Sequence, residues 1–460
     1  MRRIVVIGSS AAGMTAAISA AREGTSEVTV VTMDPVCYRR PAIPALIEGC
    51  INGPPDVRIF TPRLLDRYGI KLINPAEVTQ LDTTAKKILL RHNGRTQQLS
   101  YDSAVIATGS HAAIPPVPGR DKQGVCTFTA YEGARRILEA AGSTESAVVV
   151  GAGFIALEIA EALMHRRIDV YFNVRSRILR RLIEPDLSEF LTDRFERAGL
   201  RMLTGQAISE IGGGRRVEFV TYKGGRIDTD LVVMGTGVRP SVELAAKAAI
   251  ELGSSGAIKV NNRMETSADG IYAAGDCAES PDLATGRFVY MPVGSVGAMA
   301  GRIAGANAAG CQSHTPGFLR AQADEILGMQ VFSIGHSGTS AAEVNLELDA
   351  CDITSAEGLR QRADVEKAKI LTAEGGRIVG AQLVTRRYGS QFAYQMYKAV
   401  LDGTARRKFL EEIRAPRSGL TATAAKTAGR EFTVSRVGKT ESLIYGVSNT
   451  STRPRPGRDI

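Results

Sequence analysis

Short runs of apolar residues that end in glycine recur along the chain, and each is followed by apolar positions at helical spacing. The first run, Arg3 to Ile7, precedes Gly8, and residues 11–22 then follow a helical pattern before a second strand-like run at 27–32. The same order returns at 147–150, where an apolar run precedes Gly151. A helical pattern over 152–164 and a strand pattern over 169–173 follow. The sequence therefore predicts an α/β protein with two Rossmann-like dinucleotide-binding folds.

Other apolar runs suggest how the chain is divided. Ser103 to Ile106 reads as a buried strand, and the proline-rich segment 114–118 after it suits a domain boundary. The run at 231–237 is expected to return the chain to the first domain. From residue 321 onward, several strand patterns and an amphipathic helix near 390–401 predict a separate α+β domain. The expected domains are 1–113 with 241–315, an inserted domain over 114–240, an α+β domain over 316–448, and a disordered basic tail over 449–460.

Length and composition agree with this division. A chain of 460 residues suggests about three domains at roughly 100–200 residues each, and 44% apolar with 23% charged residues is typical of folded proteins. Lys and Arg exceed Asp and Glu by 57 − 48 = 9, but the basic residues are scattered, which disfavours nucleic acid as a partner. A basic face for dinucleotide phosphates or for an acidic protein is favoured. With no apolar run near the ~20 residues of a membrane span and no signal peptide, a cytoplasmic location is expected.

The first glycine motif has glycine at two of its three characteristic positions. Gly8 allows a tight turn, Gly13 lets helix and strand pack closely, and Ser10 replaces the middle glycine. Amides at the positive end of the helix would then face a pyrophosphate. A ribose-binding acid normally closes the second strand, but Thr32 stands there and Asp34 is the nearest acid. Whether Asp34 or hydroxyl and backbone groups hold a ribose stays open, and a glycine-rich turn without ligand is the alternative.

The second glycine motif, Gly151 to Ala156, is more complete. Asn173 stands at the end of its second strand, where an NAD-selective site would usually have Asp or Glu. Arg175 and Arg177 follow and could pair with a 2′-phosphate, although Arg is simply abundant in this chain. The preference between NAD(H) and NADP(H) is therefore open.

A segment with Gly275 and Asp276 at the end of an apolar run carries the strongest family signal. Its acid can accept hydrogen bonds from a polyol, and residues 266–279 resemble the second FAD motif of the pyridine nucleotide-disulfide oxidoreductase superfamily. The segments at 107–109, 236–241 and 290–305 resemble other motifs of these flavoproteins in the same order. The resemblance extends to about residue 429 and implies FAD in the first fold, NAD(H) or NADP(H) in the second, and a C-terminal dimerisation domain.

The resemblance, together with the motifs above, gives two sets of candidate residues. The FAD candidates are Gly8, Ser10, Gly13, Asp34, Arg40, Pro41, Thr108, Gly109, Gly275, Asp276, Gly294 and Ser295. The candidates for the nicotinamide nucleotide are Gly151, Gly153, Ile155, Glu158, Asn173, Arg175 and Gly237. By resemblance Glu158 would position the nicotinamide and is the catalytic candidate, with an ordinary helix-surface acid as the alternative.

The cysteines decide between branches of the superfamily. Six cysteines contain no Cys-x-x-Cys pair, so no metal site is predicted in this chain and an iron–sulfur cluster would belong to a partner. Similarity to NADH oxidases and coenzyme A-disulfide reductases places their redox cysteine at Pro41, with Cys37 four residues before it and Cys50 nine after it. A thiolate-based cycle is therefore not supported, although a redox role for either cysteine stays open.

The loop around Arg40 instead resembles that of ferredoxin and rubredoxin reductases, although Ala45 stands where their lysine is expected. The stretch 414–418 also lacks the histidine with which dithiol members move protons. The five histidines are interpreted as structural or surface groups.

Three functions follow. The leading hypothesis is an FAD-dependent NAD(P)(H) oxidoreductase that exchanges electrons with a protein carrier, expected to be an iron–sulfur protein. It would act as a homodimer or as the flavin subunit of a larger hetero-oligomer. The second is a stand-alone NAD(P)H oxidase or a reductase of a disulfide or another small acceptor. The third is a degenerate flavoprotein with an assembly role. The partner and the direction of electron flow stay open.

Overall fold

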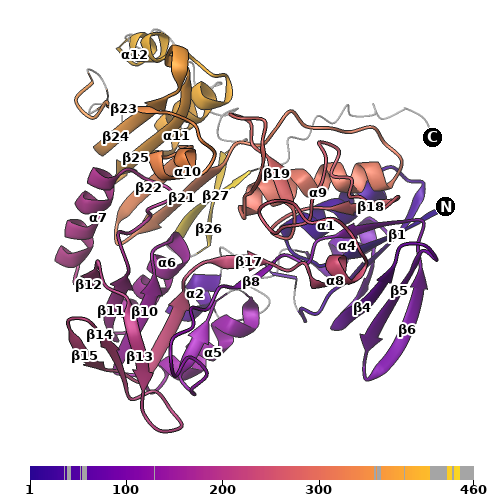
Figure 1. Cartoon of the computed structure of the whole chain (residues 1–460), viewed down its shortest axis with the longest axis horizontal. Helices are drawn as coiled ribbons and strands as arrows, with labels where there is room; N and C mark the ends of the chain where they lie inside the picture. Colours follow the sequence, from indigo (N-terminus) through magenta and orange to yellow (C-terminus); the bar gives the residue numbers. More distant parts are fainter. Residues whose placement is uncertain are drawn as a thin grey trace, which may run out of the picture.

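Three large sheets organise the chain in the computed structural model (Figure 1). The structure describes residues 1–460 except 36, 39–42, 52, 54–59, 129, 357–358, 360–363, 388, 415–431, 438–439 and 446–460. Arg40 and Pro41 lie outside the described residues, as do 415–418 of the histidine-free stretch and the predicted tail 449–460.

The first sheet is parallel and has the strand order β18-β7-β1-β2-β3. Its elements are β1 (Arg2–Ile7), α1 (Ala11–Arg22), β2 (Ser26–Val31), β3 (Lys71–Ile73), β7 (Ser103–Ile106), β18 (Ile271–Ala273) and α9 (Gly294–Ala308). The last four residues of β1 and of β2 and all four residues of β7 are buried, as expected for strands covered on both faces. The predicted strand–helix–strand unit is therefore present, and β18 joins it from far along the chain.

The second sheet is also parallel, in the order β12-β11-β10-β16-β9. Its strands are β9 (Val125–Thr127), β10 (Ser146–Gly151), β11 (Asp169–Val174), β12 (Arg201–Thr204) and β16 (Leu231–Gly235). The helices are α5 (Tyr131–Ala141), α6 (Phe154–His165) and α7 (Pro185–Arg197). The run at 231–237, expected to return the chain to the first domain, forms β16 of this second sheet, paired with β10 and β9, and leads directly into β17 (Val238–Pro240).

Smaller antiparallel sheets flank the two parallel ones. They are β4 (Ala76–Asp82) with β5 (Lys87–His92) and β6 (Arg95–Ser100), β13 (Ile208–Gly212) with β14 (Phe219–Tyr222) and β15 (Gly225–Asp228), and β19 (Glu279–Pro281) with β20 (Phe288–Tyr290). A two-stranded ribbon of β8 (Ser110–Ala112) and β17 (Val238–Pro240) lies between the first and second sheets (Figure 1). This ribbon carries the chain out of the first sheet and back again. The remaining helices of this part are α2 (Ile43–Glu48), α4 (Pro62–Arg67) and α8 (Glu243–Lys247).

The C-terminal part is built on an antiparallel sheet in the order β21-β22-β25-β24-β23. The strands are β21 (Ala321–Ile326), β22 (Met329–Gly335), β23 (Asp349–Asp352), β24 (Val365–Thr372) and β25 (Ile378–Thr385). The helices are α10 (Gly338–Ala342), α11 (Gly389–Leu401) and α12 (Arg406–Arg414), a 3-10 turn spans Glu374–Gly376, and a hairpin joins β26 (Phe432–Val437) to β27 (Thr440–Tyr445). α11 packs its apolar face on β25 and β22, which confirms the α+β character expected of this region. The predicted domain bounds themselves stay a prediction.

Among the described residues, no helix combines the length and the apolar character that crossing a bilayer requires.

Candidate dinucleotide sites

Strand register brings three of the predicted FAD segments to one edge of the first sheet. Ile106 is level with Ile7 on one side and with Ala273 on the other. The residues after these strands therefore meet at the carboxyl edge, where parallel sheets bind ligands. They include Gly8, Thr108, Gly109, Gly275 and Asp276.

The turn at Gly8 depends on glycine for both its conformation and its packing. Gly8 has φ +112°, and a Cβ there would lie 2.1 Å from the carbonyl oxygen of Ala107. A Cβ added to Gly13 would lie 2.0 Å from the carbonyl oxygen of Gly8. Ser10 is the N-cap residue of α1, but its side chain makes no capping hydrogen bond. The amides of the first turn therefore sit at the carboxyl edge of the sheet.

The position of the missing ribose acid is occupied by a buried hydroxyl pair. The Ser9 hydroxyl donates to Thr32 Oγ1 at 3.0 Å, and the Asp34 amide donates to the same oxygen at 3.2 Å. Thr32 therefore fixes the loop that carries Asp34, which is half-buried beside the turn. A ribose contact from Asp34 stays a prediction.

The rest of this edge combines polar groups with open space. The Ser110 hydroxyl donates to Asp276 Oδ2 at 2.9 Å, and the Thr108 hydroxyl donates to the Ser241 carbonyl at 2.7 Å. A Cβ added at Gly109 or Gly294 would meet no atom within 4 Å. The arrangement fits FAD, because α1 offers amides for a pyrophosphate and Asp276 offers a carboxylate for a polyol. Ser295 follows Gly294 in the first turn of α9.

The second glycine turn opens into a cavity of about 780 Å³. Gly151 is level with Gly235 in the sheet, and Val150 is level with Asn173. A Cβ at Gly151 would lie 2.2 Å from the Gly235 carbonyl oxygen, whereas one at Gly153 would meet no atom within 4 Å. Predicted nucleotide residues that line the cavity are Gly151, Gly153, Ile155, Asn173, Arg175 and Gly237.

The residues after β11 take different roles. Asn173 is 2% exposed and donates its amide to the Gln206 carbonyl at 3.1 Å. Arg177 donates to the carbonyls of Ile183 and Arg180 at 2.8 and 3.1 Å, and burial lowers its pKa. Arg177 therefore fixes its own loop and is not among the residues that line the cavity, while the exposed Arg175 is.

Glu158 is in a setting that sequence reasoning did not foresee. It lies one helical turn after Ile155 on α6, and its carboxyl group is hydrogen-bonded to that of Asp324 on β21. Burial raises the pKa of Glu158, an effect that the Asp324 hydrogen bond partly offsets, and burial with the Glu158 charge raises the pKa of Asp324 well above its ordinary value. Two adjacent carboxyl groups therefore share this site, so Glu158 is not an ordinary surface acid.

A third acid belongs to the same face of α6. Burial raises the pKa of Glu161 to about 7, although the Leu327 amide donates to its Oε1 at 3.0 Å. None of these three acids lines the nucleotide cavity. Glu158 was a candidate by resemblance, but Glu161 could be recognised in the sequence only as a charged position on an otherwise apolar helix.

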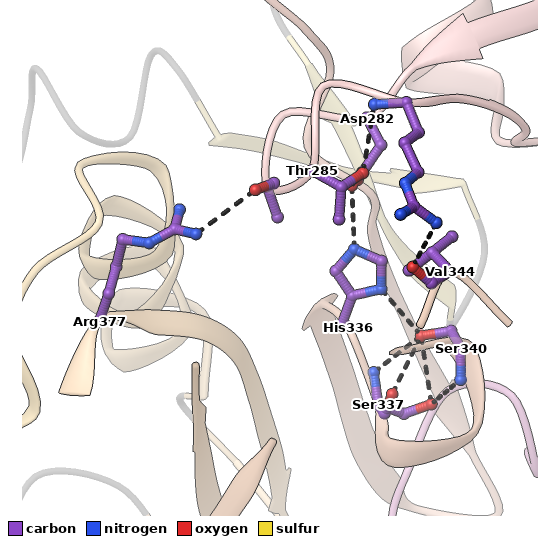
Figure 2. A network of polar contacts seen from close by, with 9 residues as sticks. Asp282, Thr285, His336, Ser337, Ser340, Val344 and Arg377 are labelled. Carbon is purple, nitrogen blue, oxygen red and sulfur yellow. Dashed lines mark hydrogen bonds and ion pairs between the residues drawn. The ribbon is translucent and has the colours of Figure 1, made fainter. Parts of the chain in front are cut away.

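A polar network fixes α10 beside the cavity, and Figure 2 shows His336 between Asp282 and Ser340. His336 Nε2 lies 3.1 Å from Asp282 Oδ2, and His336 Nδ1 lies 3.3 Å from Ser340 Oγ. Asp282 is also bonded by Thr285, and these partners lower its pKa although burial opposes them. The Ser337 hydroxyl accepts from the Ser340 amide to cap the helix. The network therefore joins the segment before α9 to the C-terminal part.

The thiols differ in exposure. Cys37, Cys126 and Cys277 are buried, and burial raises the pKa of Cys126 and of Cys277. Cys50 is exposed but follows α2, whereas the position predicted for a redox thiol precedes that helix. Among the described residues, no group of three or more His, Cys, Asp or Glu side chains could hold a metal ion.

Comparisons with known proteins show similarity over most of the chain. The sequence pattern of the pyridine nucleotide-disulphide oxidoreductase family matches residues 2–287. The chain is 33% identical over 395 residues to an NADH oxidase of Methanocaldococcus jannaschii, covering 83% of this chain and 87% of that protein. It is 31% identical over 301 residues to the assimilatory nitrate reductase electron transfer subunit of Bacillus subtilis, covering 65% of this chain but 38% of that protein. A solved NAD-dependent persulfide reductase from A. fulgidus has a TM-score of 0.82 and 28% identity, over 88% of this chain and 78% of that one.

Proposed function

The chain belongs to the pyridine nucleotide-disulphide oxidoreductase family, and from this premise we propose that it exchanges electrons directly between its flavin and a protein electron carrier. It is an NAD(P)H-dependent flavin oxidoreductase that uses FAD and a nicotinamide nucleotide. The proposed carrier is an iron–sulfur protein, as the acceptor or as another subunit of a complex.

The two sites suggest which roles belong to the cofactors and which to the residues of the chain. FAD and the nicotinamide nucleotide, when bound, supply hydride transfer and electron storage. The residues of the chain bind and orient these groups: the α1 turn and Asp276 at the first site, and the Gly151 turn with Arg175 at the second. A nicotinamide contact from Glu158 stays a prediction, since its carboxyl group is bonded to Asp324 and does not line the cavity.

The observation that carries the proposal is the placement of the thiols. A disulfide-reducing cycle needs a thiolate that is accessible at the flavin. Cys37 is 4% exposed, and Pro41 occupies the position of the redox cysteine. Without a thiol relay, electrons must leave the flavin directly. A one-electron carrier at the flavin edge is the acceptor that this arrangement suits.

Anaerobic spectroscopy tests the proposal. The yellow holoprotein is reduced with NADPH or NADH, and a ferredoxin or rubredoxin is then added while flavin absorbance is followed. We expect acceptor-dependent reoxidation, with the same rate in a variant that carries Cys37→Ser and Cys50→Ser. No reoxidation by any iron–sulfur protein tested would overturn the proposal, and loss of turnover in the double variant would restore the thiol mechanism.

A second function is favoured by the names of the relatives. The M. jannaschii relative is named NADH oxidase and the A. fulgidus structure a persulfide reductase, so direct reduction of oxygen or of a sulfur compound is the alternative. Reoxidation by oxygen or a persulfide alone in the same experiment would select it. A purified protein that does not retain FAD would instead favour an assembly role. A cytoplasmic location and a homodimer or hetero-oligomer remain part of the proposal.

A further inference from the structure

The wall of the nucleotide cavity is strongly basic where the loop after β11 forms it. Four arginines line the cavity, and the one acid among its lining residues is Glu343, at the end of α10. The arginines are Arg175, Arg180, Arg181 and Arg239. In a dinucleotide fold, this loop faces the adenosine ribose, where an acid selects the 2′-hydroxyl of NAD and an arginine accommodates the 2′-phosphate of NADP.

Arg175 is the arginine best placed for such a phosphate. It is exposed, lines the cavity and follows Asn173 of β11 by two residues. The side-chain amide of Asn173 is already bonded to the Gln206 carbonyl. Among the ion pairs between described residues, none includes Arg175 or Arg180. The neighbouring Ser176 also lines the cavity and adds a hydroxyl donor. A guanidinium fork matches phosphate geometry, and Arg175 and Ser176 present donors to the same cavity.

Arg181 differs from Arg175 because the C-terminal part holds it. Its guanidinium forms an ion pair with Glu343, and its carbonyl accepts a hydrogen bond of 2.9 Å from the Ser337 hydroxyl. The amide of Gly338 donates to Glu184 Oε1 at 2.8 Å, which ties the start of α10 to the same loop. The His336 network of Figure 2 fixes the other side of this helix. Glu343 is therefore held at the cavity wall by its ion pair with Arg181, while contacts from the loop of Arg181 and Glu184 and from Asp282 fix the helix that precedes it.

We propose that the cavity selects NADPH over NADH, with Arg175 and Ser176 binding the 2′-phosphate and Glu343 limiting the contribution of Arg181. This inference deepens the proposed function, since it names the nucleotide that the reductase uses. A carboxylate that neutralises one arginine leaves a site with a net positive charge. Preference for the 2′-phosphate is then set by the loop after β11 and adjusted by a residue from the C-terminal part.

Calorimetry with two nucleotide fragments tests the proposal on the purified holoprotein. Adenosine 2′,5′-bisphosphate carries the 2′-phosphate, and AMP lacks it. The wild-type protein should bind the bisphosphate at least about tenfold more tightly than AMP. Arg175→Ala should lower the affinity for the bisphosphate by about tenfold to a hundredfold, and the affinity for AMP by less than about threefold. Arg175→Lys should keep part of the preference, because a lysine keeps the charge but not the fork. Arg197→Ala, an exposed arginine on α7 outside the cavity, is the matched control and should change neither affinity.

Substitution of Glu343 tests its proposed role in limiting the contribution of Arg181. Glu343→Gln removes the charge that pairs with Arg181, so bisphosphate affinity should rise by about twofold to fivefold with AMP unchanged. A weaker or unchanged bisphosphate affinity would overturn the role of Glu343. Equal affinities of the wild-type protein for the two fragments, or an Arg175→Ala effect equal on both, would overturn the NADPH preference. Fragment binding needs no electron acceptor, so these outcomes are independent of whether an iron–sulfur protein is the partner.

Discussion

The helices α1 and α6 both begin at a glycine turn at the carboxyl edge of a parallel sheet, but they consist of different residues. α1 consists mainly of small residues and contains no acid, whereas α6 consists mainly of larger apolar residues and carries Glu158 and Glu161. α1 lies against the glycine-rich α9, where a Cβ at Gly301 would be 2.2 Å from the Ala12 carbonyl oxygen. α6 lies against α2 and β21, and β21 contributes Asp324.

This difference shows how one local signal leads to two kinds of site. At α1, backbone packs on backbone, and the turn is bounded by glycines and small residues. At α6, side chains do the packing and the turn opens to a cavity lined by arginines. The first unit therefore offers a close-fitting backbone surface, while the specificity of the second depends on side chains that can be exchanged.

The largest expected effect on stability comes from adding a side chain to the closely packed first glycine turn. Gly13→Val would place side-chain carbons against the Gly8 carbonyl, with a Cβ 2.0 Å from its oxygen. We expect a loss of about 3 kcal/mol or more in the free energy of unfolding, together with loss of FAD. Flavin absorbance of the purified protein and a urea unfolding curve measure both.

The change compared with it in the second turn is Gly153→Val, at the middle position of the motif, where the first turn has Ser10. A Cβ at Gly153 has no neighbour within 4 Å, so the fold and the FAD content should be kept while nucleotide affinity falls. If both variants lost FAD equally, the proposed difference between the two turns would be wrong.

A smaller effect is expected on the pH dependence of stability, because α6 carries a buried acid and α1 contains none. The pKa of Glu161 is raised from its ordinary value of 4.5 to about 7, mainly by burial, so the folded protein binds the proton more tightly than the unfolded chain. Its contribution to the free energy of unfolding falls as pH rises from 4.5 to 7 and stays low above that. Glu161→Gln keeps an acceptor for the Leu327 amide but does not ionise, so it should be more stable than wild type at pH 8 by up to about 3 kcal/mol, with the gain vanishing near pH 4.

Urea unfolding of both proteins between pH 4 and pH 8 checks this difference. Glu196→Gln, at an exposed position on α7, is the control and should follow the wild-type curve. Curves for Glu161→Gln and wild type that run parallel across this range would contradict the buried setting of Glu161.

The smallest effect concerns the hydroxyl pair that replaces the ribose acid. Ser9→Ala removes the donor to Thr32 Oγ1, which still accepts from the Asp34 amide, so the free energy of unfolding should fall by about 1 kcal/mol. FAD content should be unchanged, because the role given to the pair is to fix the loop. Thermal unfolding measures the change, and Thr32→Ser, which keeps the hydroxyl pair, should lose much less stability than Ser9→Ala. Release of FAD from Ser9→Ala would instead indicate direct contact with the ligand.

Much of the fold was predictable because its signals are local. The glycine turns, the helix over residues 11–22 and the strand over 169–173 were all expected, since apolar runs and glycine positions indicate the backbone pattern directly. The family and its cofactors were likewise expected from contiguous motifs, and the family match confirms them. Which parallel sheet residues 231–235 join could not be read from the apolar run alone, because such a run suits either sheet, and pairing with β10 and β9 decides it.

The sequence by itself determined that this protein has two dinucleotide folds, since each is specified within about thirty residues by turns that only glycine permits. The tertiary structure decided what surrounds them. Asp324 meets Glu158, Glu343 meets Arg181, and Arg177 turns into its own loop while Arg175 faces the cavity. The paired acids and arginines lie up to about 170 residues apart in the chain, and Arg175 and Arg177 differ only in the direction of their side chains. Neither the spacing nor the composition of a sequence shows which buried charges come together.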